Sequence, residues 1–178
     1  MARLSLSFLG PLQVMLDGRP VARFESNKIR ALLVYLAVEL ARPHPREVLA
    51  DLLWPDWPQR SALANLRHAL ASLRHLLGDP QADPPILLIS RETVQFNARS
   101  DHELDVAQFS ALLAQDLSQG ADVGSLEQAI ALYRGPFLEG FSVSDCAPFE
   151  GWATRQREGL QQDLLHCGLR VRAPRRYP

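Results

Sequence analysis

The clearest structural signal in the sequence is REVLADLLWPDWPQRSALANLRHALASLRHLLG, residues 46–78. Its apolar spacing predicts a short helix over residues 46–54 and a long helix over residues 59–77. The prolines within residues 55–58 force a tight turn between the two helices, and Gly78 is a typical left-handed C-terminal cap. A short helix, a tight turn and a long helix are typical of a helix-turn-helix. The residues of the short helix that we expect to face inward are Val48, Leu49, Leu52 and Leu53.

The long helix has two contrasting faces. Its leucines recur at helical spacing and predict a face turned to the core, which comprises Leu63, Leu66, Leu70, Leu73 and Leu77. The opposite face is small, polar and basic. It comprises Ser61, Ala64, Asn65, His68, Ala71, Ser72 and His75, with Arg60, Arg67 and Arg74 along one flank. Small side chains permit close approach in a major groove about 12 Å wide, where Asn, Ser, His and Arg reach base edges and flanking arginines suit phosphates.

The segments on either side complete a recognisable order. Apolar residues alternate with polar ones over residues 4–8 and 12–16, and Asp17-Gly18 is a strong hairpin signal that leads into residues 20–24. We therefore expect a three-stranded antiparallel meander, covered by a helix over residues 27–40. A second hairpin is predicted from residues 86–89 and 93–97, with Arg91 at its tip. This order is the one expected of a helix-turn-helix with a wing, and Arg91 would reach the sugar-phosphate backbone or a minor groove.

From residue 105 onward the apolar period is helical throughout. The pattern predicts paired antiparallel helices and a last long helix over residues 148–171, with Phe149, Trp152, Gln156, Leu160, Leu164, Cys167 and Val171 on one face. The expected fold class is α+β: a winged helix-turn-helix with an N-terminal antiparallel sheet, followed by an all-α part. We place the first domain at residues 1–99 and the second at residues 100–178.

Composition narrows the function classes. The chain has 178 residues, of which 47% are apolar, so it can bury a core, and no apolar run is long enough to span a bilayer. Residues 1–100 carry 12 Lys and Arg against 9 Asp and Glu, a net charge of +3, whereas residues 101–178 carry 7 against 11, a net charge of −4. The first half suits a polyanion and the second half suits a protein partner. Cys146 and Cys167 fit neither a disulfide framework nor a zinc site, and we expect both to be buried.

Several segments in order resemble one bacterial family. LGPLQVMLDGRPV, KIRALLVYLA, REVLADLLWPDWP and ALANLRHALASLRHLLG resemble the OmpR-type winged helix of the antibiotic-regulatory-protein activators. LDVAQFSALL, LEQAIALYRGPFLEGF and FEGWATRQREGLQQDLL resemble the start of the bacterial transcriptional activation domain of that family, which is built from tetratricopeptide-like helix pairs. The resemblance spans roughly residues 3–170.

The resemblance implies transcription regulation by a sequence-specific DNA-binding activator. Such a protein binds direct repeats near promoters as double-stranded DNA and recruits RNA polymerase, without a cofactor and in the bacterial cytoplasm with the nucleoid. In OmpR-type domains the loop before the third helix often contacts polymerase, and here Asp56 and Trp57 stand in that loop. Trp54 and Trp57 fit either a contact surface or core anchors, and the pattern favours the core for Trp54.

The sequence departs from the family at its end, because the activation domain usually continues for several more helices. An incomplete solenoid exposes its stacking face. We therefore expect the last helix to be covered by the winged helix or by a second copy in a homodimer, or to remain mobile. No receiver domain precedes the winged helix and no nucleotide-binding domain follows it in residues 1–178.

The sequence also bears on two other function classes, an enzyme and a protein-interaction module. The chain shows no Gly-rich phosphate loop, no Gly-x-Ser-x-Gly elbow and no paired histidines, and the five histidines fit polar surface positions, so we expect no enzyme and no metal site. Asp101, Glu103 and Asp105 form an acidic run that fits a solvated helix N-terminus better than a cation site. The alternative to a DNA-binding activator is a protein-interaction module whose winged helix no longer binds DNA.

Overall fold

The N-terminal strands form the predicted meander in the computed structural model, which describes residues 3–119 and 123–172, with side chains over 3–114 and 124–166. Strand β1 (Leu4–Ser7) pairs antiparallel with β2 (Gln13–Leu16), which pairs antiparallel with β3 (Arg19–Pro20). Asp17 and Gly18 both have positive φ angles, 51° and 74°, as a two-residue hairpin turn requires. The predicted hairpin is therefore confirmed.

The sheet differs from the prediction in two respects. A fourth strand, β7 (His102–Leu104), pairs parallel with β1, so the order is β3-β2-β1-β7 and the sheet is not purely antiparallel. The third strand is also shorter than the expected residues 20–24. Strand β7 has three residues without apolar alternation, and its partner strand lies about a hundred positions away in sequence. No local sequence pattern therefore predicts this strand.

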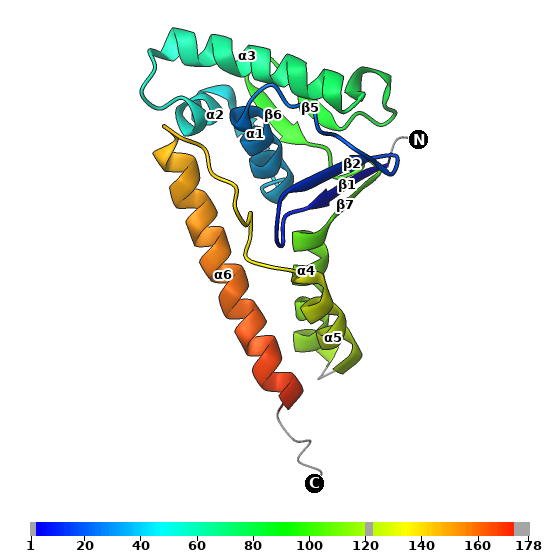
Figure 1. Cartoon of the computed structure of the whole chain (residues 1–178). Helices are drawn as coiled ribbons and strands as arrows, with labels where there is room; N and C mark the ends of the chain where they lie inside the picture. Colours follow the sequence, from blue (N-terminus) through cyan, green and yellow to red (C-terminus); the bar gives the residue numbers. More distant parts are fainter. Residues whose placement is uncertain (1–2, 120–122, 173–178) are drawn as a thin grey trace.

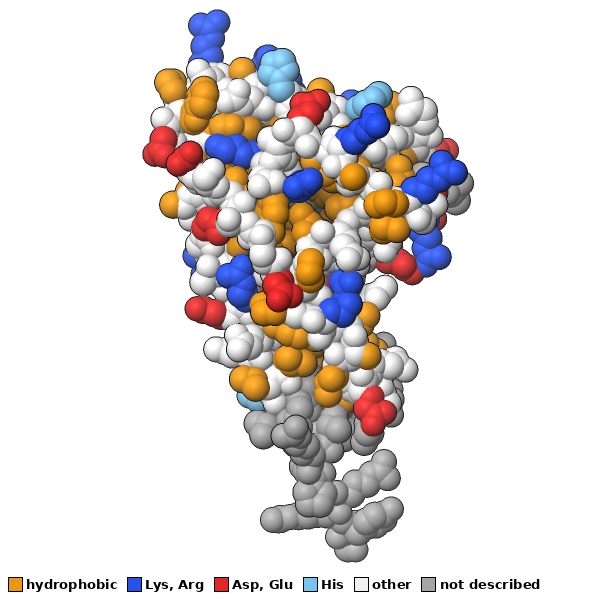
Figure 2. Space-filling model, viewed as in Figure 1, with side chains coloured by type: hydrophobic (Ala, Val, Ile, Leu, Met, Phe, Trp, Pro, Cys, Tyr) orange, Lys and Arg blue, Asp and Glu red, His pale blue; other side chains and the backbone are white. Residues whose placement is uncertain are grey.

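Three helices follow β3 along the chain, and α1 packs against both α2 and α3 (Figure 1). Helix α1 (Asn27–Val38) begins at the N-cap Ser26 and is buried continuously from residue 31 to residue 37, so it is the central element. Helices α2 (Arg46–Leu53) and α3 (Gln59–Leu76) confirm the predicted pair, and Gly78 adopts a left-handed φ of 62° just beyond α3. In the space-filling view, Arg and His side chains stand along the edge formed by α3 (Figure 2).

Val48 was expected to face inward and is 48% exposed, so that prediction was wrong. The two-turn helix α2 buries a narrow stripe made of Leu49, Ala50 and Leu53. Val48 lies outside this stripe because neighbouring helix positions differ by about 100°.

The predicted second hairpin is confirmed. Strands β5 (Leu87–Ile89) and β6 (Thr93–Phe96) pair antiparallel, and β4 (His44–Pro45) joins β6 at its other edge. A short 3₁₀ turn, η1 (Asp79–Gln81), connects α3 to this three-stranded sheet.

The second half consists of α4 (Asp105–Gln119), α5 (Val123–Leu132) and the long α6 (Ala147–Arg172). Helices α4 and α5 lie side by side below the first sheet, and α6 runs from α2 alongside α5 (Figure 1). Trp152 on α6 packs edge-on against Tyr35 of α1 at 5.0 Å between ring centroids, and its Nε1–H donates to Glu39 Oε1 at 2.9 Å.

The stacking face of α6 is therefore covered within the same chain. Phe149, Trp152 and Leu160 are buried and Leu164 is half-buried, while the side chains of Cys167 and Val171 lie outside the described residues. Of the expected alternatives, packing on the first half of the chain accounts for the described part of this face. A homodimer stays a prediction.

Cys146 is buried, as expected, at the junction of the two halves. Its thiol donates to the Leu53 carbonyl at 2.9 Å. Burial raises the pKa of this thiol, and the nearby Lys28 ammonium offsets part of the rise. The apolar core runs from Leu4 on β1 to Leu160 on α6 as one cluster, and the domain boundary after residue 99 stays a prediction.

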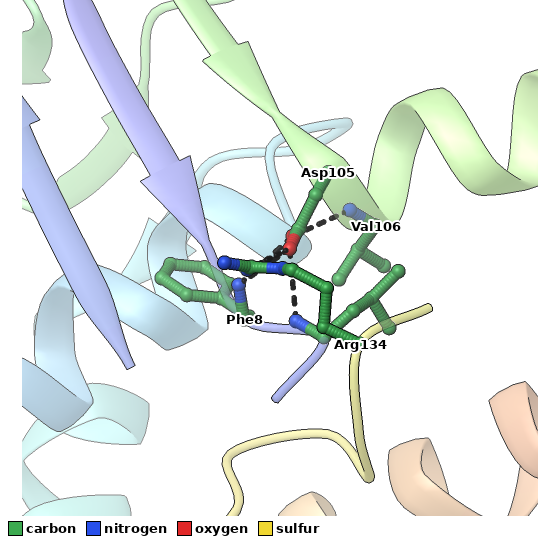
Figure 3. A network of polar contacts seen from close by, with 5 residues as sticks. Phe8, Asp105, Val106 and Arg134 are labelled. Carbon is green, nitrogen blue, oxygen red and sulfur yellow. Dashed lines mark hydrogen bonds and ion pairs between the residues drawn. The ribbon is translucent and has the colours of Figure 1, made fainter. Parts of the chain in front are cut away.

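Asp105 joins the two halves through backbone hydrogen bonds (Figure 3). Its carboxylate accepts the N–H of Phe8 and the N–H of Leu9 at 2.9 Å and the N–H of Val106 at 2.8 Å, and it pairs with the Arg134 guanidinium at 3.3 Å. The acidic run was expected to be a solvated helix N-terminus. Asp105 does open α4, but it is 8% exposed, so for this residue the solvation was wrong. A solvated carboxylate would not hold the end of β1 to the start of α4, whereas the buried carboxylate of Asp105 does so.

Asp105→Ala is expected to lower the free energy of unfolding by about 2–4 kcal/mol, because it removes a helix cap and leaves two buried N–H groups without an acceptor. Urea denaturation measures this change. The control is Asp101→Ala at an exposed position, which should change stability by no more than about 0.5 kcal/mol. Equal stabilities of the two variants would contradict the structural role of Asp105.

Candidate nucleic-acid interface

Helix α3 rests on the body of the protein through one face. It packs against α1, α2 and η1, and its buried residues are Ala62, Leu66, Ala69, Leu70 and Leu73, with Leu77 buried at the C-cap. Four of the five predicted core leucines are thus confirmed. Leu63 is half-buried, because it lies at the edge of this face. The helix has 18 residues, which corresponds to about 27 Å at 1.5 Å per residue.

The opposite face of α3 is open and free of acidic residues. Arg60, Arg67, His68, Ala71, Arg74 and His75 are exposed, whereas Ser61, Ala64, Asn65 and Ser72 are half-buried. The helix carries three arginines and no Asp or Glu, so its formal charge is +3 with neutral histidines. The described residues of the acidic second half do not bury this face. The structure therefore brings the predicted residues of α3 together on one surface, which we call the α3 face.

The arginines of the α3 face differ in what they contact. Arg60 and Arg67 form no ion pair with any described residue. Arg74 Nε, in contrast, donates to Asp79 Oδ2 at 2.8 Å. Asp79 is 2% exposed, and its other oxygen accepts the N–H of Ile86 and of Leu87 at 2.6 and 2.9 Å. Arg74 is thus tied to the segment that leads into β5.

Asp79 was missed by sequence reasoning because Asp79-Pro80 looked like the start of a polar loop. A signal was nevertheless present. An Asp directly after a left-handed glycine cap stands where the chain reverses, and short polar side chains there commonly accept backbone N–H bonds. The carboxylate fixes the β4-β6-β5 sheet relative to the C-terminal end of α3.

The tip of the β5–β6 hairpin exposes Arg91, as predicted. Ser90 closes the tip, since its Oγ accepts the N–H of Thr93 at 2.9 Å and that of Glu92 at 3.2 Å. The guanidinium of Arg46, at the start of α2, donates through Nε and Nη2 to the Ser90 carbonyl at 3.2 and 2.9 Å. The hairpin tip is therefore fixed to the helix pair, and sequence reasoning did not find Arg46.

The loop between α2 and α3 separates its two tryptophans. Trp54 is buried, which confirms the core position that the pattern favoured, and the Lys28 ammonium lies 5.5 Å from its ring centroid. Trp57 is 54% exposed, and Asp56 is exposed beside it. The loop therefore presents one large aromatic side chain to solvent next to a carboxylate.

Other kinds of site find little support in the described part of the chain. No group of three or more His, Cys, Asp or Glu is placed there to hold a metal ion, and no described helix is long and apolar enough to cross a bilayer. The expectation that all histidines lie on the surface was wrong for His44. It is 2% exposed, and its Nε2 lies 2.9 Å from the Glu39 carbonyl oxygen.

The geometry defines a mixed α+β protein with an open basic helix, and comparison with known proteins finds relatives of the chain. No family model matches the chain. The transcriptional regulatory protein EmbR of Mycobacterium bovis and of Mycobacterium tuberculosis is 32% identical in an alignment of 144 residues that covers 77% of this chain and 37% of EmbR. The solved structure of Mycobacterium tuberculosis EmbR in complex with a low-affinity phosphopeptide matches with a TM-score of 0.72 and 26% identity, over 96% of this chain and 45% of that one.

The chain is therefore homologous to EmbR and shares its fold over the aligned part. It spans less than half the length of these relatives. The relatives bear the name of a transcriptional regulator rather than an enzyme.

Arg74→Ala is expected to lower the free energy of unfolding by about 1–2 kcal/mol, because it leaves the buried Asp79 carboxylate with one partner fewer. The control is Arg67→Ala, one seven-residue step earlier on the same flank, which should stay within about 0.5 kcal/mol of the parent protein. Urea denaturation of both variants distinguishes an arginine that anchors Asp79 from one that has no internal ion pair. A loss for Arg67→Ala as large as that for Arg74→Ala would refute the anchoring role.

Proposed function

We propose that this chain is a DNA-binding transcription regulator of the antibiotic-regulatory-protein family. In this proposal, α1 to α3 with the β5–β6 hairpin form an OmpR-type winged helix-turn-helix, and α4 to α6 form a tetratricopeptide-like transcriptional activation domain. The observation that carries the proposal is the α3 face, which is exposed, basic and free of carboxylates. Homology to a transcriptional regulator supports it independently.

The α3 face has the shape and chemistry that a major groove accepts. Ala64 and Ala71 add little bulk to the face, so the helix axis can approach the base pairs closely. Asn65 and His68 carry groups that hydrogen-bond to base edges, as do Ser61, Ser72 and His75. We assign these residues to sequence readout.

We assign the phosphate contacts to the arginines around this face. Arg60 and Arg67 have no ion-pair partner among the described residues, so their guanidinium groups need not give up a carboxylate to bind DNA. Arg91 extends from a fixed hairpin tip and suits the backbone or the adjacent minor groove. Arg74 supports the fold through Asp79 and contributes its remaining exposed donors, since 44% of its side chain is accessible.

Activation of transcription requires a second partner. We assign RNA polymerase to the exposed loop residues Asp56 and Trp57, because a solvent-facing tryptophan beside a carboxylate is typical of a protein contact. The DNA partner is duplex DNA with direct repeats near promoters, bound in the bacterial cytoplasm. The alternative of an interaction module without DNA binding is not favoured, because it gives the acid-free α3 face no role.

A salt titration of duplex binding tests the DNA partner. Duplexes selected from a random pool serve as probes, and log affinity is followed against log salt by fluorescence anisotropy. We expect a steep decline with a slope of about −0.9 for each phosphate contacted, and Arg67→Ala should reduce that slope by about 0.9. A flat salt response of the parent protein would contradict DNA binding and favour the interaction module.

Base readout gives a different signature. Asn65→Ala is expected to leave the salt slope unchanged and to alter preference between related sites by about 1–3 kcal/mol. Arg67→Ala is the matched control, because it should weaken all sequences alike. If Asn65→Ala also weakened all sequences alike, Asn65 would not read bases.

Trp57→Ala is expected to reduce transcription from a target promoter in a purified system several-fold while DNA affinity stays the same, because Trp57 is exposed and is not among the residues that we assign to DNA. Val48→Ala, a change at another exposed apolar residue of the helix pair, is the control. Unchanged transcription with Trp57→Ala would remove the loop from the polymerase contact.

A further inference from the structure

A second set of arginines lies beside the C-terminal end of α3. It borders the flank of the α3 face that carries no arginine of α3 itself. Arg19 on β3 and Arg23 after it are both exposed. Together with Leu76 of α3 they line a shallow groove whose other walls are Leu16, Asp17, Pro20, Val21 and Ala22. The segment between β2 and α1 therefore lies beside the C-terminal end of α3, although more than fifty residues separate them in sequence.

The helical geometry places this contact opposite the arginine flank of α3. At about 100° per residue, Leu76 lies about 180° around the helix from Arg67 and about 160° from Arg74. The α3 face stands between these two directions. Arg19 and Arg23 thus border one side of the α3 face, and Arg60, Arg67 and Arg74 border the other.

The segment that carries Arg19 and Arg23 is held at both ends. The N–H of Val21 donates to the Val14 carbonyl at 2.8 Å, which continues the pairing of β3 with β2. Farther along, the Arg30 guanidinium lies 5.3 Å from the Phe24 ring centroid, and Ser26 caps α1. The two arginines consequently project from a fixed backbone rather than from a free loop.

The nearby carboxylates do not cancel this charge by direct pairing. Asp17 Oδ1 accepts the backbone N–H of Arg3 at 2.8 Å, and Glu25 is exposed. Neither Arg19 nor Arg23 forms an ion pair with a described residue. Their guanidinium groups can therefore bind an anion without first breaking an internal contact.

We infer that Arg19 and Arg23 bind the phosphates of the second DNA strand, so that the protein grips both walls of the major groove around α3. This inference rests on the proposed function. A helix with its side chains is about 10–12 Å across and the major groove is about 12 Å wide, so side chains on opposite flanks of one helix meet opposite strands. The arginines of α3 hold one backbone, and the β3–α1 segment holds the other.

The test compares two double variants in the salt titration with a selected duplex. Arg19→Ala with Arg23→Ala should reduce the slope of log affinity against log salt by about 1.8, which is two phosphate contacts at about 0.9 each. The matched control is Arg42→Ala with Arg155→Ala, which removes the same charge from exposed positions beside the groove between α1 and α6. The control should leave the slope unchanged, and thermal melting of both proteins checks that they fold.

Phosphate ethylation interference then assigns the strand. The parent protein should show interference on both strands flanking the groove, and the Arg19/Arg23 double variant should lose it on one strand while Arg67→Ala loses it on the other. An unchanged slope for the Arg19/Arg23 variant, an equal reduction in the control, or loss on the strand that Arg67 contacts would overturn the inference and leave the proposed function standing. A flat response of the parent protein would instead overturn the proposed function itself.

Discussion

The arrangement of the two halves depends on the hydrogen bonds and the ion pair of the Asp105 carboxylate. A buried charge is unfavourable unless it is paired and hydrogen-bonded, and here backbone N–H groups from the end of β1 and the start of α4 meet it together with Arg134. The same end of β1 is also held by the segment before α6, since the Leu138 N–H donates to the Phe8 carbonyl at 2.8 Å and the Gly10 N–H to the Pro136 carbonyl at 3.2 Å. These contacts fix where α4 begins and how α6 returns to α2.

The consequence for function is that α3 stays uncovered. Helix α6 packs on α2 and α5, and Trp152 fixes it to α1 through Tyr35 and Glu39, so the helical half is held on the side of the molecule away from the α3 face (Figure 1). Two further polar anchors position the elements around α3. Asp79 holds the C-terminal end of α3 to the β4-β6-β5 sheet, and Arg46 holds the hairpin tip to α2. A rigid support behind an open basic helix is what groove binding requires.

Much of this architecture could be predicted from sequence because it is local. The helices over residues 46–78 follow from apolar period, prolines and a glycine cap, and the Asp17-Gly18 turn follows from its demand for positive φ. The α3 face followed from the same period. Long-range features could not be predicted, because they depend on partners that are distant in sequence. They are the parallel strand β7, the burial of Asp105, and which of the expected alternatives covers α6. Val48 shows that prediction is also limited within one helix. Periodicity predicts that a helix has an apolar face, but not how wide a stripe of that face is buried.

The most direct test of the central claim, that α3 enters duplex DNA, is amide chemical-shift mapping of the isotopically labelled chain titrated with a selected duplex. If α3 enters the duplex, the largest shift changes will fall on residues 59–76 and on the hairpin tip at residues 90–92, with little change along α5 and α6. Changes concentrated on α4 to α6, with α3 unaffected at saturating duplex, would contradict it.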